Sequence, residues 1–274
     1  MTHQTDDRFK GNRAFSTLGC GGLSLEQAME VAHDHRIPCL ELRTLGGSVD
    51  LPGYFSGKYG NPGQLAMAVG AMPAKIVSLG TSLKLTRNDE RDRRAFLAYV
   101  AWAEACGAST LRVFDGGATG GVDEVRHAMT TLSWWKALRE ENGWNVDIAV
   151  ETHDAFAIES NLLRLLDALP ECKLIWDAHH TWRKGGSNPV RTWQRIRERV
   201  GHIHVKDSIG NRLAASGYVY VLPGEGDFPM AALLEALCRD GYEGVLSLEW
   251  ERHWHQDLPT LEEALSTARH RAWW

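Results

Sequence analysis

The segment VDIAVE (146–151) decides the fold, because it alternates aliphatic and polar residues and then ends on a carboxylate. Alternation with a period of two is typical of a strand with one face in an aliphatic layer. Three further segments share this design and carry an acidic or imidazole side chain at or near their end. They are KLIWD (173–177), HIHV (202–205) and GVLSLE (244–249). We therefore predict four consecutive strands that present Glu151, Asp177, His204 and Glu249.

Strand-like segments alternate with helical patterns along the whole chain. The other four predicted strands are AFSTL (14–18), CLELR (39–43), KIVSL (75–79) and TLRVF (110–114). Between them, Ser24 and Gln27 form a capping-box pattern, and Gly107 ends an apolar helical stripe as a C-cap would. A last helix is predicted at about 259–270. Eight strands with helical crossovers predict an α/β fold, a single (β/α)₈ TIM barrel.

Composition limits the organisation and the partners. We expect one barrel domain over residues 1–274, with 1–13 as a polar N-terminal tail. The net charge of −5 gives no electrostatic footprint for nucleic acid or an anionic membrane, and no apolar run approaches the ~20 residues of a membrane span. The N-terminus lacks the apolar core of a signal peptide, and five scattered cysteines suit free thiols. We therefore expect a cytoplasmic protein with no nucleic-acid or membrane partner; a homo-oligomer is left open.

The alternation also predicts which side chains point into the barrel. Aliphatic residues of each strand should face the helices, which leaves the intervening residues in the lumen. The inward set is unusually polar: Glu41, Arg43, Arg112, Glu151, His202, His204, Lys206 and Glu249. The latest of these in each strand should lie at the C-terminal mouth, where TIM-barrel enzymes carry their active sites. So many charges in one lumen indicate a bound ligand.

Three carboxylates and one imidazole at four successive strand ends form a ligand set for a divalent cation. These donors suit Mn²⁺ best, with Mg²⁺, Co²⁺ and Zn²⁺ as alternatives. Without a cation, the carboxylates would repel each other in a partly buried site. Carboxylates at strand ends also cap helices or pair with arginine, and that alternative applies to any one of them. All four together favour a metal site made of Glu151, Asp177, His204 and Glu249.

Four further side chains are placed to reach a substrate held at this metal. His180, on the loop after the second of these strands, is predicted to contact a substrate hydroxyl, and His153, at the rim, is a second predicted contact. Lys206 and Arg112 either bind a substrate oxygen or phosphate or neutralise the carboxylates. Glu251 is a weaker alternative ligand.

Two other histidines are assigned different roles. His202 shares the inward face of His204 but lies one layer deeper, so it is predicted to be a hydrogen-bonded core residue. His179 is predicted to lie behind the site or at the surface. The PGEGDFP segment (223–229) resembles no phosphate-binding loop and is expected to shape a turn before a crossover helix.

Taken together, the motifs resemble the sugar phosphate isomerase/epimerase superfamily, whose fold is a xylose isomerase-like TIM barrel. The resemblance covers nearly the whole chain and rests on ACGASTLRVFDGG (105–117), VETH (150–153), WDAHH (176–180), GHIHVKD (201–207), PGEGD (223–227) and LSLEWE (246–251). It implies that the quartet binds the metal. In ketose 3-epimerase relatives the two glutamates also move protons on opposite faces of the sugar, and the histidine that matches His180 binds the substrate.

These observations predict a metal-dependent isomerase or epimerase of a small sugar or sugar derivative. It would act through an enediolate, with Glu151 and Glu249 as catalytic acid–base residues. One alternative keeps the same chemistry but expels a leaving group, as a lyase or dehydratase on a 3-keto sugar. Two others are an apurinic endonuclease-like phosphodiesterase, which needs more metal ligands and a basic face, and a non-catalytic carbohydrate-binding barrel.

Overall fold

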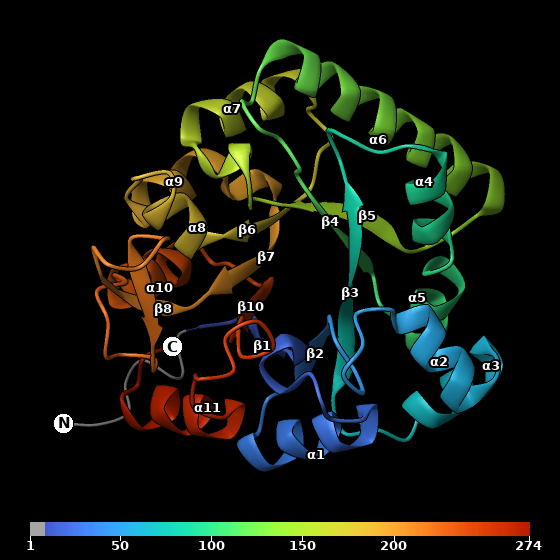
Figure 1. Cartoon of the computed structure of the whole chain (residues 1–274), viewed down its shortest axis with the longest axis horizontal. Helices are drawn as coiled ribbons and strands as arrows, with labels where there is room; N and C mark the ends of the chain where they lie inside the picture. Colours follow the sequence, from blue (N-terminus) through green and yellow to red (C-terminus); the bar gives the residue numbers. More distant parts are fainter. Residues whose placement is uncertain (1–8) are drawn as a thin grey trace.

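The computed structural model describes residues 9–274 and contains a closed barrel of eight parallel strands (Figure 1). The barrel strands are β1 (Asn12–Ser16), β2 (Cys39–Leu42), β3 (Lys75–Lys84), β4 (Thr110–Phe114), β5 (Asp147–Glu151), β6 (Leu174–Asp177), β7 (Val200–Val205) and β10 (Val245–Leu248). Around the barrel their order is β1-β10-β7-β6-β5-β4-β3-β2. Sequence neighbours are thus spatial neighbours, and the predicted TIM barrel is confirmed.

Helices connect the strands and form an outer ring (Figure 1). The α-helices are α1 (Leu25–His35), α2 (Leu51–Tyr59), α3 (Pro62–Val69), α4 (Glu90–Leu97), α5 (Val100–Cys106), α6 (Val122–Asn142), α7 (Glu159–Ala168), α8 (Ala178–Arg183), α9 (Pro189–Ile196), α10 (Met230–Arg239) and α11 (Leu261–His270). Short 3₁₀ helices lie at η1 (Thr17–Cys20), η2 (Ala155–Ala157) and η3 (Arg197–Arg199). Within residues 9–274, no helix has both the length and the apolar character needed to cross a membrane.

Local sequence signals explain where several helices begin and end. Ser24 caps α1 with the predicted capping box, accepting from the Gln27 backbone while the Gln27 side chain accepts from Ser24 N–H. Gly107 ends α5 in the left-handed conformation (φ 68°), a region that glycine enters at low cost. The apolar stripe before it forms two helices, α4 and α5, instead of one continuous helix.

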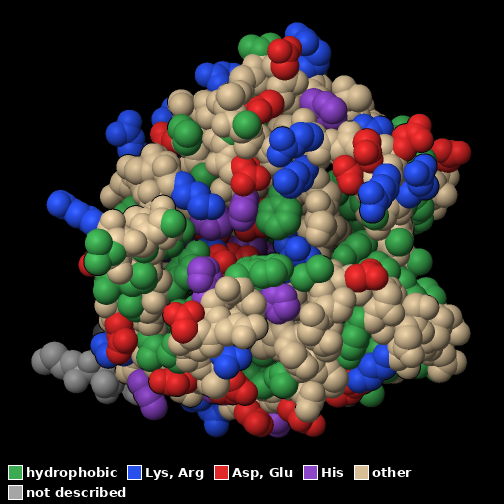
Figure 2. All heavy atoms as spheres, in the orientation of Figure 1, with side chains coloured by type: hydrophobic (Ala, Val, Ile, Leu, Met, Phe, Trp, Pro, Cys, Tyr) green, Lys and Arg blue, Asp and Glu red, His purple; other side chains and the backbone are tan. Residues whose placement is uncertain are grey.

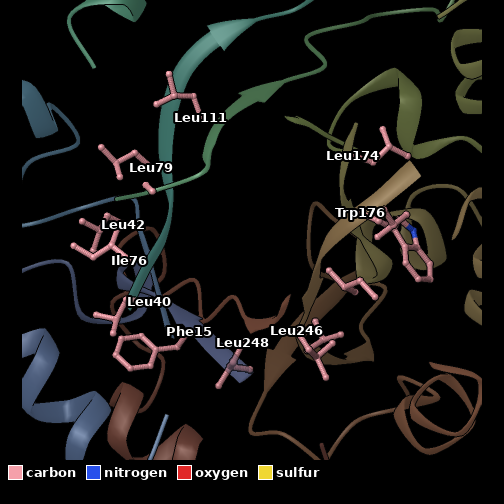
Figure 3. Packing of buried hydrophobic residues seen from close by; sticks show 14 of the residues in the cluster. Phe15, Leu40, Leu42, Ile76, Leu79, Leu111, Leu174, Trp176, Leu246 and Leu248 are labelled. Carbon is pink, nitrogen blue, oxygen red and sulfur yellow. The ribbon is translucent and has the colours of Figure 1, made fainter. Parts of the chain in front are cut away.

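The main hydrophobic core lies between the strands and the helices. Figure 3 labels ten of its members: Phe15, Leu40, Leu42, Ile76, Leu79, Leu111, Leu174, Trp176, Leu246 and Leu248. All ten are almost fully buried. The residues between them, such as Glu41, Ile175 and Ser247, lie outside this core cluster although they too are buried. The predicted division of each strand into a helix-facing and a lumen-facing side is therefore confirmed for these strands.

Two features of the fold differ from the sequence predictions. The segment after β7 forms an antiparallel hairpin, β8 (Asp207–Gly210) with β9 (Tyr218–Val221), which we did not predict. Strand β1 begins at Asn12, so residues 12 and 13 pair in the barrel although we expected them in the N-terminal tail. Most of that expected tail, residues 1–8, lies outside the described residues. The five cysteines are free, as predicted.

Candidate metal centre

Four adjacent strands bring the predicted metal ligands together at the mouth of the barrel. Glu151 ends β5 and Asp177 ends β6. On the next two strands, His204 of β7 pairs with Ser247 of β10, and Glu249 follows directly after the end of β10. One ligand atom from each member of the quartet lies within 4.8 Å of the others. All four residues are buried, with at most 6% of their surface exposed. The quartet is therefore a single site built by strand register, and metal binding there remains a prediction.

The space-filling view shows where this site opens. In Figure 2 the centre of the molecule is hollowed, and acidic, basic and histidine side chains gather in and around the hollow. The same orientation in Figure 1 places the barrel strands around that position. A small polar molecule would thus meet charged groups at the mouth.

Arg112 neutralises one end of the quartet. It extends from β4 and brings Nε to 3.2 Å from Glu151 Oε2, and its Nη1 donates to the carbonyl oxygen of Thr81 at 2.9 Å. Burial and the neighbouring Glu249 raise the pKa of Glu151, but Arg112 and His204 outweigh them and lower it overall. Of the two roles that the sequence left open for Arg112, these contacts are those of a neutralising residue, and substrate binding stays a prediction.

Lys206 neutralises the other end. Its ammonium is fully buried and contacts Asp177 Oδ2 at 2.9 Å, Glu251 Oε1 at 2.6 Å and Glu249 Oε2. Although burial alone would lower it, these three carboxylates raise the pKa of Lys206 well above the ordinary value. In turn, Lys206 and His204 hold the pKa of Glu249 well below its usual range against the effect of burial. Lys206 is therefore cationic and holds these carboxylates together.

Glu41 orients His204 and was absent from the site residues predicted from the sequence. Its Oε2 lies 2.7 Å from His204 Nε2 and 3.0 Å from His202 Nε2. A carboxylate on one imidazole nitrogen fixes the ring and leaves the other nitrogen for a metal. That other nitrogen, His204 Nδ1, is buried without a hydrogen-bond partner, 3.4 Å from Glu151 Oε1 and 3.5 Å from Glu249 Oε1. The inward phase of Glu41 was the sequence signal that could have identified it.

His202 lies in the deeper layer that the sequence predicts. It is level with Ile175 of β6, whereas His204 is level with Asp177. With Glu41 and His204 it forms a second group of three metal-ligand types. Glu41 contacts both imidazoles through one oxygen, and His202 is buried as expected, but its Nε2 lies 3.0 Å from Glu41 Oε2 without the geometry of a hydrogen bond.

The two predicted substrate-contacting histidines lie side by side at the rim. The rings of His153 and His180 are 4.9 Å apart between centroids and nearly perpendicular. His180 is buried, with Nδ1 3.0 Å from Asp177 Oδ2, and its backbone N–H donates to Asp177 Oδ1 at 2.7 Å as α8 begins. His153 is only partly buried and packs against the Phe114 ring at 4.8 Å. His153 is therefore the more exposed of the two, and His180 lies against Asp177, a predicted metal ligand.

His179 belongs to an enclosed aromatic cluster and not to the surface. It is fully buried, its Nε2 lies 2.8 Å from Ser208 Oγ, and its ring centroid is 5.1 Å from Tyr218 and 5.6 Å from Trp182. Burial and the nearby Lys206 lower its pKa well below the ordinary value. It is a neutral packing residue beside the hairpin, which agrees with a position behind the site.

Two buried aspartates shape the loops around the mouth. Asp115 accepts from the backbone N–H of His153 at 3.1 Å, Asp154 at 2.9 Å and Phe156 at 3.2 Å. Asp207 in the same way accepts from the N–H of Gly224, Gly226 and Phe228 at 2.9, 3.0 and 3.1 Å. A Cβ at Gly226 would lie 2.2 Å from Asp207 Oδ1. The PGEGDFP segment therefore shapes a turn, as predicted, and its glycine admits the carboxylate.

The β8–β9 hairpin adds Tyr220 to the wall of the site. The Tyr220 hydroxyl donates to Glu251 Oε1 at 2.9 Å, and its ring is 5.4 Å from His255 between centroids. Because Glu251 pairs with Lys206 and Tyr220, it lies beyond the quartet. Tyr220 could not be placed from the sequence, since the hairpin was not predicted.

The quartet fits a divalent cation by its own chemistry. Metal–oxygen and metal–nitrogen distances of about 2.0–2.6 Å require donor atoms roughly 3–4.5 Å apart, compatible with the 4.8 Å limit found here. The partnerless Nδ1 of His204 faces two of the carboxylates, as a ligand would. Glu151, Asp177, His204 and Glu249 are therefore the residues that would hold the ion.

The fold and the cluster together define a TIM barrel with a polar centre at its C-terminal mouth. The model of the xylose isomerase-like TIM barrel family matches residues 64–271, and the chain belongs to this family. The rhizopine catabolism protein MocC of Rhizobium meliloti is 28% identical over 131 residues, which are 42% of this chain and 40% of that protein. The match thus spans about two fifths of the curated relative.

Solved structures share the fold across nearly the whole chain. The probable 3-DHS dehydratase AsbF of Bacillus anthracis has a TM-score of 0.74 at 18% identity, covering 95% of this chain and 99% of that one. The IolI protein with a bound zinc atom has a TM-score of 0.74 at 17% identity, covering 95% and 96%. A xylose isomerase domain protein of Salmonella typhimurium has 0.74 at 14% identity, covering 96% of each chain. At these identities the likeness shows the fold.

Proposed function

We propose that the protein is a divalent-metal-dependent isomerase or epimerase of a small sugar or sugar derivative that acts through an enediolate. The observation that carries the proposal is the placement of two glutamates at the ends of the quartet. Glu151 and Glu249 come from β5 and β10, with β6 and β7 between them in the barrel. Two carboxylates on either side of one centre suit proton removal at one face of a carbon and delivery at another.

A bound divalent cation, Mn²⁺ first among the candidates, would polarise a substrate carbonyl and stabilise the developing enediolate charge. Arg112 and Lys206 keep the two glutamates ionised at neutral pH, because each places its cation on a carboxylate oxygen. The same contacts make each glutamate a weak base, so the carbon acid must itself be acidified. His153 and His180 are proposed to bind substrate hydroxyls at the rim.

Solvent deuterium tests this proposal. Glu151→Gln and Glu249→Gln should each lower turnover by at least ~10²-fold, the lower range for lost general acid–base catalysis. In wild-type protein, deuterium should enter the carbon beside the carbonyl, and in at least one variant it should not. If wild-type turnover instead retains the substrate's own hydrogen completely, a hydride shift operates and the acid–base roles are wrong.

A second candidate is a lyase or dehydratase on a 3-keto sugar or a related keto compound. The same two glutamates favour it, because an enolate formed beside a hydroxyl-bearing carbon can expel that hydroxyl instead of being reprotonated. The AsbF structure, described as a probable dehydratase, shares the fold. Product analysis by NMR separates the two: loss of water yields an unsaturated ketone or its aromatised product, whereas isomerisation conserves mass.

The two remaining alternatives are less well supported by the site. An endonuclease-like centre needs several ligands beyond the quartet, and the additional candidates within residues 9–274 are Glu41 and His202, which contact each other in the deeper layer. A non-catalytic carbohydrate-binding barrel has no need for two ionised glutamates beside a partnerless imidazole nitrogen. Such a protein would bind sugar without any exchange of substrate hydrogen.

A further inference from the structure

Arg43 is a buried cation that contacts no carboxylate within residues 9–274. It follows β2, is 6% exposed, and lies one pleat beyond the inward-facing Glu41. Its guanidinium donates to Gly80 O and Ser82 Oγ, both at 3.4 Å, which is long for hydrogen bonds. No acidic side chain within residues 9–274 forms an ion pair with it. A guanidinium has five N–H donors, so most of this group's capacity is unused.

Leaving a charge buried and unpaired costs stability, so the presence of Arg43 at this position needs an explanation. Arg112 is a neighbouring cation that makes the arrangement less favourable by repulsion, and both side chains approach Gly80, where a Cβ would lie 2.8 Å from Arg43 Cδ and from Arg112 Nη2. Arg112 has Glu151 as its ion-pair partner. Burial and Arg112 lower the pKa of Arg43 to about 10 although Tyr99, Glu151 and Glu249 oppose them from a distance, and Arg43 is still charged at neutral pH. Arg112 therefore has a carboxylate in contact, and Arg43 is influenced by the site's carboxylates without touching one.

The position of Arg43 relates it to the metal centre. Arg43 and Arg112 both lie over the Phe114 ring, with Cζ 5.9 and 3.9 Å from its centroid. Phe114 pairs with Glu151 in the sheet and is therefore level with the quartet. The quartet occupies β5, β6, β7 and β10, whereas Arg43 lies after β2, on the other half of the barrel. A molecule held at the quartet by one end would extend across the mouth toward Arg43.

We propose that Arg43 forms an oxyanion subsite, with Arg112 beside it, and that the substrate is an acidic sugar derivative that carries a carboxylate or a phosphate. This inference rests on the proposed function, because it assigns the far end of the same substrate. The planar guanidinium fork matches the two oxygens of a carboxylate or phosphate. A bound anion would therefore supply the ion-pair partner that Arg43 does not find within the described residues.

Equilibrium binding of unreactive analogues to the Mn²⁺-loaded protein tests the subsite. The probes are a five- or six-carbon aldonate, the corresponding neutral alditol and the alditol phosphate. We expect at least one anionic probe to bind more tightly than the alditol. Arg43→Met should weaken that binding by ~10–100-fold, as for a lost charge-assisted hydrogen bond, and leave the alditol unchanged. Whichever anion binds tighter identifies the source of the oxyanion.

Two further variants and one stability measurement serve as controls. Arg94→Met removes an exposed arginine of α4 that pairs with Glu90, and it should change neither probe's affinity. Arg43→Met should also raise the thermal midpoint of the ligand-free protein, because it removes an unpaired buried charge, and this controls for misfolding. Arg43→Lys keeps the charge but loses the planar fork, so its anion binding should be intermediate.

The inference and the proposed function fail in different ways. If the aldonate, the phosphate and the alditol bind equally, or if Arg43→Met leaves anion binding unchanged, the subsite is wrong even when deuterium exchange proceeds with neutral sugars. If anion binding depends on Arg43 while no substrate exchanges hydrogen with solvent, the subsite stands and the isomerase proposal falls.

Discussion

Replacing Glu41 with glutamine should weaken metal binding without removing a ligand. The side chain lies beneath the quartet and holds His204 Nε2 at 2.7 Å, which leaves Nδ1 directed at the carboxylates. The amide keeps the size of the carboxylate but loses its charge, and it can present N–H₂ to the imidazole instead of oxygen. His204 would then lose the contact that sets its orientation and its basicity.

The expected loss of metal affinity follows from the contact between Glu41 and His204. Loss of a carboxylate that orients a metal-bound histidine typically lowers metal affinity 10–100-fold, which is about 1.4–2.7 kcal/mol. His202 also contacts the same Glu41 oxygen at 3.0 Å, so the substitution alters the surroundings of both imidazoles. We expect Mn²⁺ or Co²⁺ affinity, measured by calorimetry at constant pH, to fall within this range. The absorption bands of bound Co²⁺ should also change, because they report the ligand field.

A charge-matched control separates orientation from simple electrostatics. Glu251→Gln also removes one negative charge near the site, but Glu251 contacts Lys206 and Tyr220 and makes no contact with His204. It should lower metal affinity less than Glu41→Gln and leave the Co²⁺ spectrum unchanged. Equal losses in both variants would refute the orienting role, and a complete loss in Glu251→Gln would make Glu251 a ligand.

Four further predictions use other parts of the molecule. His180→Ala should keep its metal while KM rises or turnover falls; loss of metal as complete as in Asp177→Ala, measured by elemental analysis, would instead make His180 a ligand. Lys206→Met should destabilise the metal-free protein by ~3–5 kcal/mol, because three buried carboxylates lose their cation, and Mn²⁺ should raise its thermal midpoint more than that of wild type. Asp207→Asn should cost ~2–4 kcal/mol in urea unfolding at unchanged metal affinity, since several backbone N–H groups lose a charged acceptor; an unchanged midpoint would contradict this. Lys58 and Tyr59 lower the pKa of Glu26 to about 2 although burial opposes them, so its stabilisation is present above the unfolded value of about 4.3 and is lost as pH falls toward 2. Glu26→Gln should therefore reduce stability at neutral pH but not near pH 2, by no more than ~1 kcal/mol for this exposed pair, and an equal deficit at both pH values would count against the ion pair.

The barrel could be predicted because its strands carry a strong local signal. Alternation in 146–151 assigns Glu151 to the lumen, and the same period assigns Leu248 to the core and Glu249 to the mouth. Once eight such strands close into a ring, the C-terminal residues of neighbouring strands must meet. The proximity of the quartet was therefore a consequence of period and order, which are both properties of the sequence.

The pairings within the site could not be predicted in the same way. Glu41 is 163 residues from His204 along the chain, and their contact depends on how long side chains from β2 and β7 extend across the lumen. The β8–β9 hairpin depends on a turn between residues 211 and 217, where no strand period identifies it. Lys206 illustrates the difference, because its inward phase was predictable while its three carboxylate contacts were not.

The three buried cations around the mouth differ in whether they contact a carboxylate. Lys206 and Arg112 hold Glu249 and Glu151 ionised, so part of the negative charge of the quartet is balanced before any metal arrives. Arg43, which follows β2, has no carboxylate at ion-pair distance within residues 9–274 and contacts Gly80 and Ser82 instead. A neutral sugar would leave that charge unpaired in the complex, whereas an acidic one would pair it. Substrate charge should therefore influence binding more strongly than the arrangement of hydroxyls at the end far from the quartet.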